Sequence, residues 1–159
     1  MISFSDLIAL VGVTTTTFMA GLLFVFSSCV MRTLRDASPA QGLAAMTSIN
    51  RDIVNPIFGL VFVASVVAAI AAVVATIDSF ADRPWLFVAG VVHLAGFLAV
   101  TATVHLPLNA RFETLDASAD TDVAQWIEGA ARWTRFNHVR SAATILASIA
   151  YGAHLATQL

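Results

Sequence analysis

Polar residues that would be costly inside a lipid bilayer gather near the ends of long apolar segments in this sequence. They include two histidines, several asparagines, two arginines and a cysteine, all expected at one end of the molecule. The group is Cys29, Arg32, Asn50, Asn55, His105, Asn109, Asn137, His138 and Arg140. Neutral histidine is the commonest metal ligand and also a frequent general base. The grouping, rather than any one residue, indicates a functional site.

Several members of this group also have structural interpretations. Asn55 precedes Pro56, as a helix N-cap precedes a proline at the first helical position. Asn109 can cap the end of a helix, and His138 can lie solvated at the membrane interface. Arg140 can reach toward a lipid phosphate. These alternatives stay open for each residue taken alone.

The sequence predicts no metal site. His105 and His138 should lie at similar depth on antiparallel helices, but a metal ion normally needs a third or fourth ligand. No acidic residue lies within the apolar segments, and Cys29 is the one soft ligand at that depth. His93 and His154 are possible haem ligands, but by helical rise their depths differ by roughly 7 Å. A haem or a metal held by a histidine pair is therefore the less favoured alternative.

Four segments are long and apolar enough to cross about 30 Å of hydrocarbon as helices, which takes roughly 20 residues. They cover residues 7–31, 53–77, 85–106 and 137–157. Hydrophobic residues make up 58% of the chain and charged residues only 11%, too few to cover the surface of a soluble domain of this size. We therefore predict one integral membrane domain over residues 1–159, an all-α bundle of four transmembrane helices.

The two longer links should carry amphipathic helices that extend the second and fourth spans. Ser38 followed by Pro39 predicts a helix start in the first link, and Asp120 predicts another in the third. Apolar residues then recur at helical spacing in both links. They are Leu43, Met46 and Ile49 in the first, and Val123, Trp126, Ile127, Ala130 and Trp133 in the third.

Arginine placement predicts the orientation of the bundle. The chain has no lysine, and seven arginines lie in or beside the two longer links, which leaves only Arg83 on the other side. Positive residues favour the cytoplasmic side, so both termini should lie outside the cytoplasm of a bacterial cell membrane. The first apolar run has no preceding basic residue, so we expect it to stay as a helix rather than be cleaved.

Composition also limits the partners. The net charge of -2 and the absence of a basic patch exclude nucleic acid, and the single Cys29 cannot form an internal disulfide. Small residues four apart allow close helix packing, which permits a homo-oligomer. These residues are Thr17 and Gly21, and Thr144, Ser148 and Gly152. We expect the lipid bilayer and a hydrophobic small molecule as partners.

Several blocks of the sequence resemble the anthrone oxygenase family. Their order and spacing cover nearly the whole chain. The blocks are Phe24 to Leu34, Met46, Ile49-Asn50, Asn55-Pro56, Val104, Pro107-Leu108-Asn109, Trp133 and Phe136-Asn137-His138-Val139-Arg140. The resemblance implies a four-helix membrane protein. From the fungal members it implies oxidation of an anthrone to an anthraquinone by O₂, with no known organic cofactor.

The residues are compatible with that chemistry. The enolate of an anthrone can pass an electron directly to O₂, so the protein needs an apolar slot, one base and donors for an oxyanion. We predict His138 or His105 as the base. The predicted donors are Asn55, Asn109, Asn137 and Arg140. The predicted substrate-binding residues are Phe24, Phe26, Asn50, Phe58, Trp133 and Phe136, although aromatic residues near a membrane surface are also common interface residues.

We therefore predict a small oxidoreductase of the monooxygenase or oxidase type, acting on a lipid-soluble aromatic substrate at the cytoplasmic end of the bundle. O₂ is the expected co-substrate. The alternative is a non-enzymatic membrane binding module or an accessory subunit. A transporter is less favoured, because transporters usually place ionisable residues near the membrane midplane.

Overall fold

The computed structural model describes residues 2–158, and the regular structure within this range is entirely helical. The chain forms five continuous helical segments. The first joins α1 (Phe4–Val25), the π-helical turn η1 (Phe26–Val30) and α2 (Met31–Asp36). The second and third are α3 (Pro39–Asp52) and α4 (Pro56–Thr76). The fourth joins α5 (Pro84–His93), η2 (Leu94–Ala99), η3 (Thr101–His105) and α6 (Leu106–Phe112), and the fifth is α7 (Asp120–Ala156).

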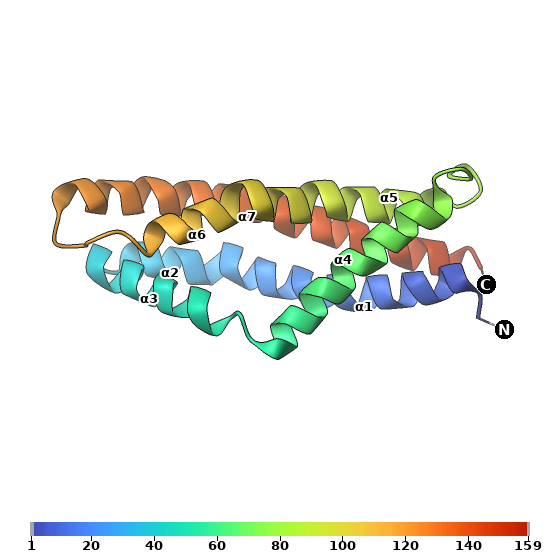
Figure 1. Ribbon diagram of the computed structural model, residues 1–159, viewed down its shortest axis with the longest axis horizontal. Coiled ribbons are helices and arrows are strands. Elements are labelled where there is room, and N and C mark those ends of the chain that lie inside the picture. Colours follow the sequence, from blue (N-terminus) through green and yellow to red (C-terminus); the bar gives the residue numbers. More distant parts are fainter. Residues whose placement is uncertain (1, 159) are drawn as a thin grey trace.

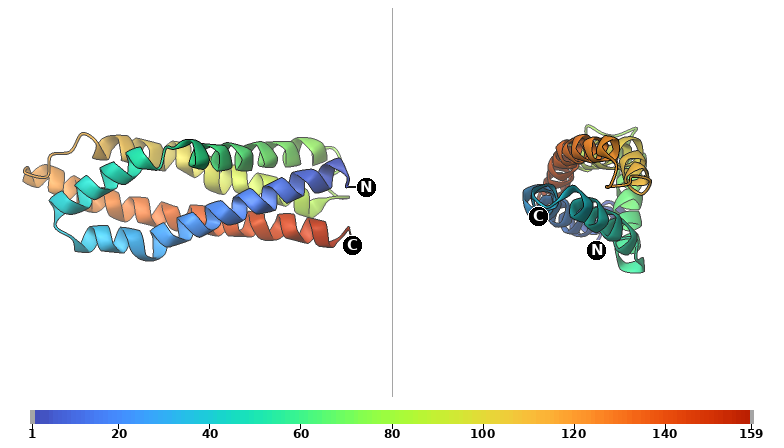
Figure 2. Two further views of the ribbon diagram at one scale, coloured as in Figure 1. Left: turned by 90° about the horizontal axis from the view of Figure 1, so that it is seen from below. Right: turned by 90° about the vertical axis from the view of Figure 1, so that its left-hand side faces the viewer.

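The segments pack side by side into an elongated bundle (Figures 1 and 2). Both chain ends and the α4–α5 connection lie at one end, which we call the terminal end. Helices α2, α3 and α6 and the first turns of α7 lie at the other, the distal end. Helix α1 packs along α7, and α4 lies across α1 and α5. The chain therefore runs the length of the bundle four times.

Three helices are long and apolar enough to cross a membrane: Phe4–Asp36, Pro56–Thr76 and Pro84–Phe112. The first and third contain the predicted spans 7–31 and 85–106 and run further toward the distal end, whereas the second lies within the predicted span 53–77. Helix α7 contains the fourth predicted span up to residue 156 but is not selected by the same length and composition criteria. The helical, membrane-compatible character of the protein is thus confirmed, whereas a bundle of four spans is not.

The predicted helix starts are confirmed, with capping contacts at α3 and α4 and without a side-chain cap at Asp120, where α7 begins. The Ser38 hydroxyl accepts from the Gln41 N–H ahead of Pro39 at the start of α3. The Asn55 side chain accepts from the Ile57 and Phe58 N–H groups at the start of α4. These contacts satisfy orphan donors that a helix start would otherwise leave. The extension before the second span is a separate helix, because the helical structure is interrupted between Asp52 and Pro56.

Small residues hold the helices close together near the terminal end. A Cβ on Gly12 would lie 2.6 Å from the Tyr151 ring, so only glycine lets α1 approach α7 there. A Cβ on Gly90 would likewise lie 2.6 Å from the Ala69 carbonyl oxygen, so α5 approaches α4 through glycine. Close approach of this kind takes the place of the hydrophobic drive that is missing in lipid.

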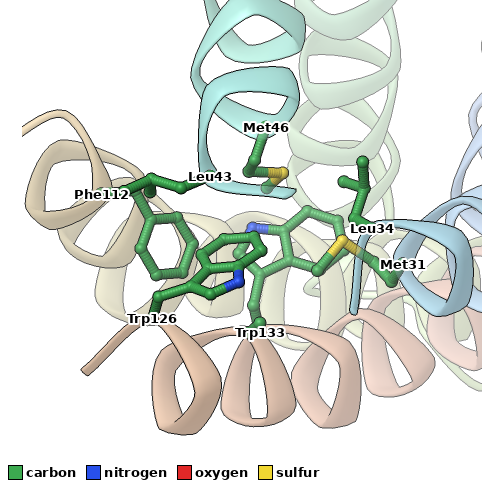
Figure 3. Close-up of a cluster of buried hydrophobic side chains, with 8 residues drawn as sticks. Met31, Leu34, Leu43, Met46, Phe112, Trp126 and Trp133 are labelled. Carbon is green, nitrogen blue, oxygen red and sulfur yellow. The ribbon is translucent and has the colours of Figure 1, made fainter. Parts of the chain in front are cut away.

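The distal end has a core of its own, which we call the distal core (Figure 3). Trp126 and Trp133 extend from α7 toward Met46 on α3, with Phe112 of α6 and Met31 of α2 on either side. The full set of buried members is Met31, Leu34, Leu43, Met46, Phe112, Trp126, Ala130 and Trp133. The predicted apolar faces of the two longer links therefore pack against each other through most of their residues, whereas Ile127 is 58% exposed and Val123 lies outside the distal core.

Three π-helical turns interrupt the first and third apolar helices. In η1 the Met31 N–H donates to the Phe26 carbonyl, and in η3 the Leu106 N–H donates to the Thr101 carbonyl, each five residues back. Pro107 lies two residues after the end of η3 and has no N–H for the Thr103 carbonyl, which disfavours an ordinary α-helical turn there. Such turns occur often at functional sites.

Candidate active site

A cavity of about 380 Å³ lies between the distal core and the middle of the bundle. All five helical segments contribute to its wall, which is mostly apolar. The polar residues in the wall are Asn50, Thr101, His105, Asn109 and Arg140. Two more open hollows, one beside α3 and one beside Asp6, contain none of the predicted site residues. An apolar cavity with a few convergent polar groups is the usual form of a small-molecule site.

Arg140 is the charged residue in this wall. It is buried, with 8% of its surface exposed. Its guanidinium donates to the Thr101 hydroxyl over 3.2 Å and to the Asn137 side-chain oxygen over 2.6 Å. Its Nε–H has no partner, and within residues 2–158 no carboxylate lies within salt-bridge distance of it. Because this buried cation is hydrogen-bonded only to neutral groups, its positive charge remains uncompensated beside the cavity.

Asn137 holds this arginine in place from behind the cavity wall. Its amide nitrogen donates to the Leu23 carbonyl over 2.9 Å and to the Ser27 hydroxyl over 2.7 Å. Its oxygen accepts the bond from Arg140. Asn137 thus ties α7 to the junction of α1 and η1, and the π-helical turn η1 contributes one of its partners.

His105 also lines the cavity, and its ring packs edge-on with the Trp133 ring, with 4.8 Å between the ring centroids. Its Nδ1 lies 3.4 Å from the Val100 carbonyl oxygen, and its Nε2 lies 3.3 Å from the Trp133 carbonyl oxygen. A neutral imidazole has only one N–H, so one of these nitrogens faces an oxygen with its lone pair. A proton gained by His105 would let both nitrogens donate.

Two asparagines complete the polar wall. The Trp133 indole N–H donates to the Asn109 side-chain oxygen over 2.9 Å, which fixes both residues. The Asn50 amide nitrogen is buried and has no protein partner. An unpartnered amide N–H in a cavity wall is available to a ligand oxygen.

The polar wall on the fourth helical segment follows a row of residues spaced four apart. Phe97, Thr101, His105 and Asn109 all line the cavity, and His93 stacks on Phe97 at 4.6 Å between ring centroids. In an α-helix a four-residue step overshoots one turn by about 40°, so such a row would turn away from the cavity. Turns η2 and η3 contain more residues per turn and keep the row on one face.

Comparison with known proteins adds one finding to this geometry. The model of the anthrone oxygenase family matches residues 46–150, from α3 to near the end of α7. The chain belongs to the anthrone oxygenase family. No curated protein and no solved structure matches it. The matched range contains every polar residue of the cavity wall, so these residues lie within the part of the chain that matches the anthrone oxygenase family.

The structure brings together many of the site residues predicted from the sequence. Asn50, His105, Asn109 and Arg140 line the cavity, as do the predicted ring-binding residues Phe26, Phe58 and Trp133. Asn137 stands behind Arg140 and does not line the cavity.

Four other predicted residues lie elsewhere in this anthrone oxygenase family member. His138 is exposed on the outer face of α7, and Asn55 caps α4. Phe24 is 58% exposed, and Phe136 lies beneath the Arg132 guanidinium, 6.0 Å from ring centre to guanidinium carbon. Of the two bases predicted from the sequence, His105 is the one that reaches the cavity.

Several cavity residues were not predicted. Thr101, Phe62 and Phe97 line the wall, and Ser27 supports Asn137. The four-residue row from His93 to Asn109 was a signal for Phe97 and Thr101. We find no comparable signal in the sequence for Phe62 or Ser27.

Proposed function

We propose that this protein is a membrane-embedded oxygenase that uses O₂ to oxidise a lipid-soluble aromatic compound bound in the cavity as its oxygen anion. The observation that carries the proposal is Arg140: a buried guanidinium beside an apolar cavity, with no carboxylate partner in the described chain. An enolate or phenolate oxygen of a flat ligand would supply the missing negative charge, while apolar side chains such as Phe58 and Phe62 cover the rings.

We further propose that α7 crosses the membrane as a fourth span. Its second half presents large apolar side chains outward, where lipid would cover them: Val139, Ile145, Leu146 and Ile149 are 39–62% exposed. The polar side chains that lower its overall hydropathy, Arg140, Ser141 and Thr144, are buried against the other helices. This inside-out pattern is typical of polar residues in membrane bundles.

The orientation follows from the same arrangement. With four spans both termini lie on one side, as both lie at one end of the bundle in Figure 1. Seven of the eight arginines lie at or next to the distal end, so we propose that this end faces the cytoplasm of a bacterial cell membrane.

The proposed reaction begins with removal of one proton from the acidic methylene carbon of an anthrone-like substrate. We propose His105 as the base, because it is the histidine in the cavity wall. Its ring nitrogens face the Val100 and Trp133 carbonyls, so the ring would first turn one nitrogen from its carbonyl toward the substrate. The electron pair moves onto the ring carbonyl, and the resulting enolate oxygen is stabilised by Arg140.

O₂ then accepts the electrons. The enolate transfers one electron to O₂, and the carbon radical and superoxide combine to form a C–O bond, giving a hydroperoxide after protonation. Loss of water from this C–H hydroperoxide leaves the quinone carbonyl. The balance is one anthrone and one O₂ to one anthraquinone and one water. We propose no organic cofactor, because the enolate itself supplies both electrons.

Oxygen uptake by the purified protein in nanodiscs tests this proposal, with anthrone as substrate and uncatalysed autoxidation subtracted. We expect catalysed uptake that is lost in Arg140→Gln and retained in Arg135→Gln, a matched change at an exposed arginine of the same helix. Loss of a single oxyanion donor typically reduces turnover on the order of 10²-fold.

The base is identified by comparing two histidine variants in the same assay. Loss of uptake in His105→Gln with retention in His138→Gln supports the assignment from the cavity, and the reverse result moves the base to His138. Binding of an anthrone without uptake by the unaltered protein would instead assign a non-enzymatic binding role.

A further inference from the structure

We propose that the ligand enters the cavity sideways from the hydrocarbon of the bilayer, through a portal between the first turns of α4 and the start of α6. This inference rests on the proposed function, because it takes the cavity to be the substrate site. Four residues define the portal: Val54, Gly59, Val63 and Leu106, all of which belong to the cavity wall.

The sequence of α4 and α5 opens a wedge toward this place. Near the terminal end the two helices touch through Gly90 and Ala69, where a side chain on Gly90 would collide with the α4 backbone. One turn further, the Ser65 hydroxyl and His93 Nε2 lie 3.1 Å apart. Next, two full aromatic rings separate the helices, with Phe62 and Phe97 centroids at 5.3 Å. The side chains between the two helices thus become larger toward the distal end. In the same direction α4 diverges from the fourth helical segment in Figure 1.

The portal residues face outward as well as inward. Val54, Val63 and Leu106 line the cavity, and they are also 78%, 57% and 59% exposed. Their side chains contain only carbon and hydrogen. Since α4 is long and apolar enough to cross a membrane, we take the medium outside this opening, beside Gly59 and Val63 of α4, to be lipid rather than water.

Packed side chains bound the cavity toward both ends of the bundle. Toward the distal end, Phe26, Ile49 and Trp133 belong both to the cavity wall and to the packing of the distal core; Figure 3 shows Trp133 within that core. Toward the terminal end, Met19, Leu23 and Phe97 form a buried cluster that also lines the cavity. A ligand moving along the bundle axis from either end would have to pass through one of these packed clusters.

The route narrows the class of substrate. A compound that enters through a carbon-lined opening must be dissolved in the membrane in its neutral form, flat enough to pass between two helices. It meets Arg140 and His105 only after entry. The same compound must therefore ionise inside the cavity, which fits an aromatic ketone or phenol that carries an acidic hydrogen and excludes a permanent anion such as a carboxylate or sulfonate.

Gly59 offers a direct way to close the portal. It lies in the cavity wall on α4, and a Cβ built on it meets no atom within 4 Å, so a large side chain there would extend into open space. Gly21 on α1 is the matched control, because its Cβ also meets nothing within 4 Å and it is outside the cavity wall. Truncation of Leu106 in Leu106→Ala widens the same opening.

The experiment measures entry of 9,10-anthraquinone, which cannot be oxidised further in this way, by quenching of tryptophan fluorescence in lipid nanodiscs. The quenching assigned to the cavity is the part that Trp133→Phe removes. We expect Gly59→Trp to slow both association and release about tenfold, Gly21→Trp to leave both unchanged, and Leu106→Ala to accelerate both. Adding lipid at constant total quinone should slow association in proportion to the dilution of quinone within the lipid.

The outcomes separate the portal from the function. Unchanged rates in Gly59→Trp, with normal quenching at equilibrium, would overturn the portal and leave the cavity as the binding site. An association rate that follows aqueous quinone rather than its fraction in lipid would do the same. Absence of cavity quenching in the unaltered protein would overturn both proposals, and equal slowing in Gly21→Trp and Gly59→Trp would show a general effect of tryptophan in place of a portal.

Discussion

The guanidinium carbon of Arg140 lies 5.4 Å from the centre of the Trp133 ring, two helical turns back along α7. The indole thus provides one face of contact for the cation, in addition to its bonds to Thr101 and Asn137. Cation–π contact and neutral hydrogen bonds reduce the cost of burying the charge without neutralising it. The positive charge stays available to a ligand.

A carboxylate placed beside Arg140 should compete with the ligand. Thr101 accepts a bond from Arg140 and lines the cavity, so Thr101→Asp would neutralise the cation in place, whereas Thr101→Asn would not. We expect anthrone oxidation to fall on the order of 10²-fold in Thr101→Asp, with a thermal midpoint no lower than that of Thr101→Asn. Equal activities of the two variants would contradict an anionic ligand at Arg140.

Removal of the Asn137 side chain should destabilise the protein. Asn137→Ala leaves the Leu23 carbonyl, the Ser27 hydroxyl and one guanidinium N–H without this partner. Buried groups that lose a partner cost about 1–3 kcal/mol each before relaxation, so the thermal midpoint in detergent should fall clearly. His138→Ala, one residue along and exposed, is the control and should leave the midpoint unchanged.

A methyl group at Gly12 should separate α1 from α7. The added carbon would lie 2.6 Å from the Tyr151 ring, whereas at Gly21 of the same helix it would meet nothing within 4 Å. We expect Gly12→Ala to destabilise the protein by about 1–3 kcal/mol, as overpacking does. Gly21→Ala should be neutral or slightly stabilising, since alanine favours helix. Unfolding measured in mixed micelles would compare the two, and equal stabilities would show that Tyr151 moves aside freely.

Replacement of Pro107 should restore regular α-helix at η3 and disrupt the arrangement of the cavity residues. Pro107→Ala restores an N–H for the Thr103 carbonyl, so the π-helical turn η3 can relax to an α-helix. We expect unchanged or increased thermal stability together with a loss of anthrone oxidation, because His105 and Asn109 would turn away from the cavity. Retained activity with increased stability would mean that proline is not what maintains the π-helical turn.

Cysteine labelling in intact cells tests the four-span topology. In a Cys29→Ser background, Ala81→Cys in the α4–α5 connection and Gln158→Cys near the C-terminus should both react with a membrane-impermeant maleimide. Ser118→Cys, between α6 and α7, should react only after the cells are opened. A protected Gln158→Cys beside a reactive Ala81→Cys would indicate that α7 does not cross the membrane.

Much of the fold could be predicted because apolar length and helix caps are local features. Three spans and the starts of α3, α4 and α7 follow from such features. The buried face of α7 could also be predicted from the sequence. The apolar row through Trp126, Ala130 and Trp133 continues at the same spacing to Asn137 and Arg140. His138 is one step off that row, which explains its exposure.

The fourth helical segment, from α5 to α6, could not be predicted to the same depth. Its cavity-lining residues are spaced four apart, and in an uninterrupted α-helix residues with this spacing would not stay on one face. The π-helical turns that keep them on one face depend on tertiary packing as well as on Pro107. The convergence of His105 and Arg140 on one cavity therefore required the structure. The capping role of Asn55 was one of two open alternatives in the sequence, favoured by the following proline, and the structure shows this role.

The π-helical turns also have a consequence for how this site is inherited. A π-helical turn is in effect one additional residue in a helix, and each residue of an α-helix advances about 100° around the axis. Deletion of one residue within Leu94–Ala99 would therefore rotate Thr101, His105 and Asn109 together by that angle, although all three would still be present. Two relatives can share every polar side chain of this cavity and still differ in whether those side chains meet. An alignment gap in the third helix is thus as informative about activity as a substituted histidine.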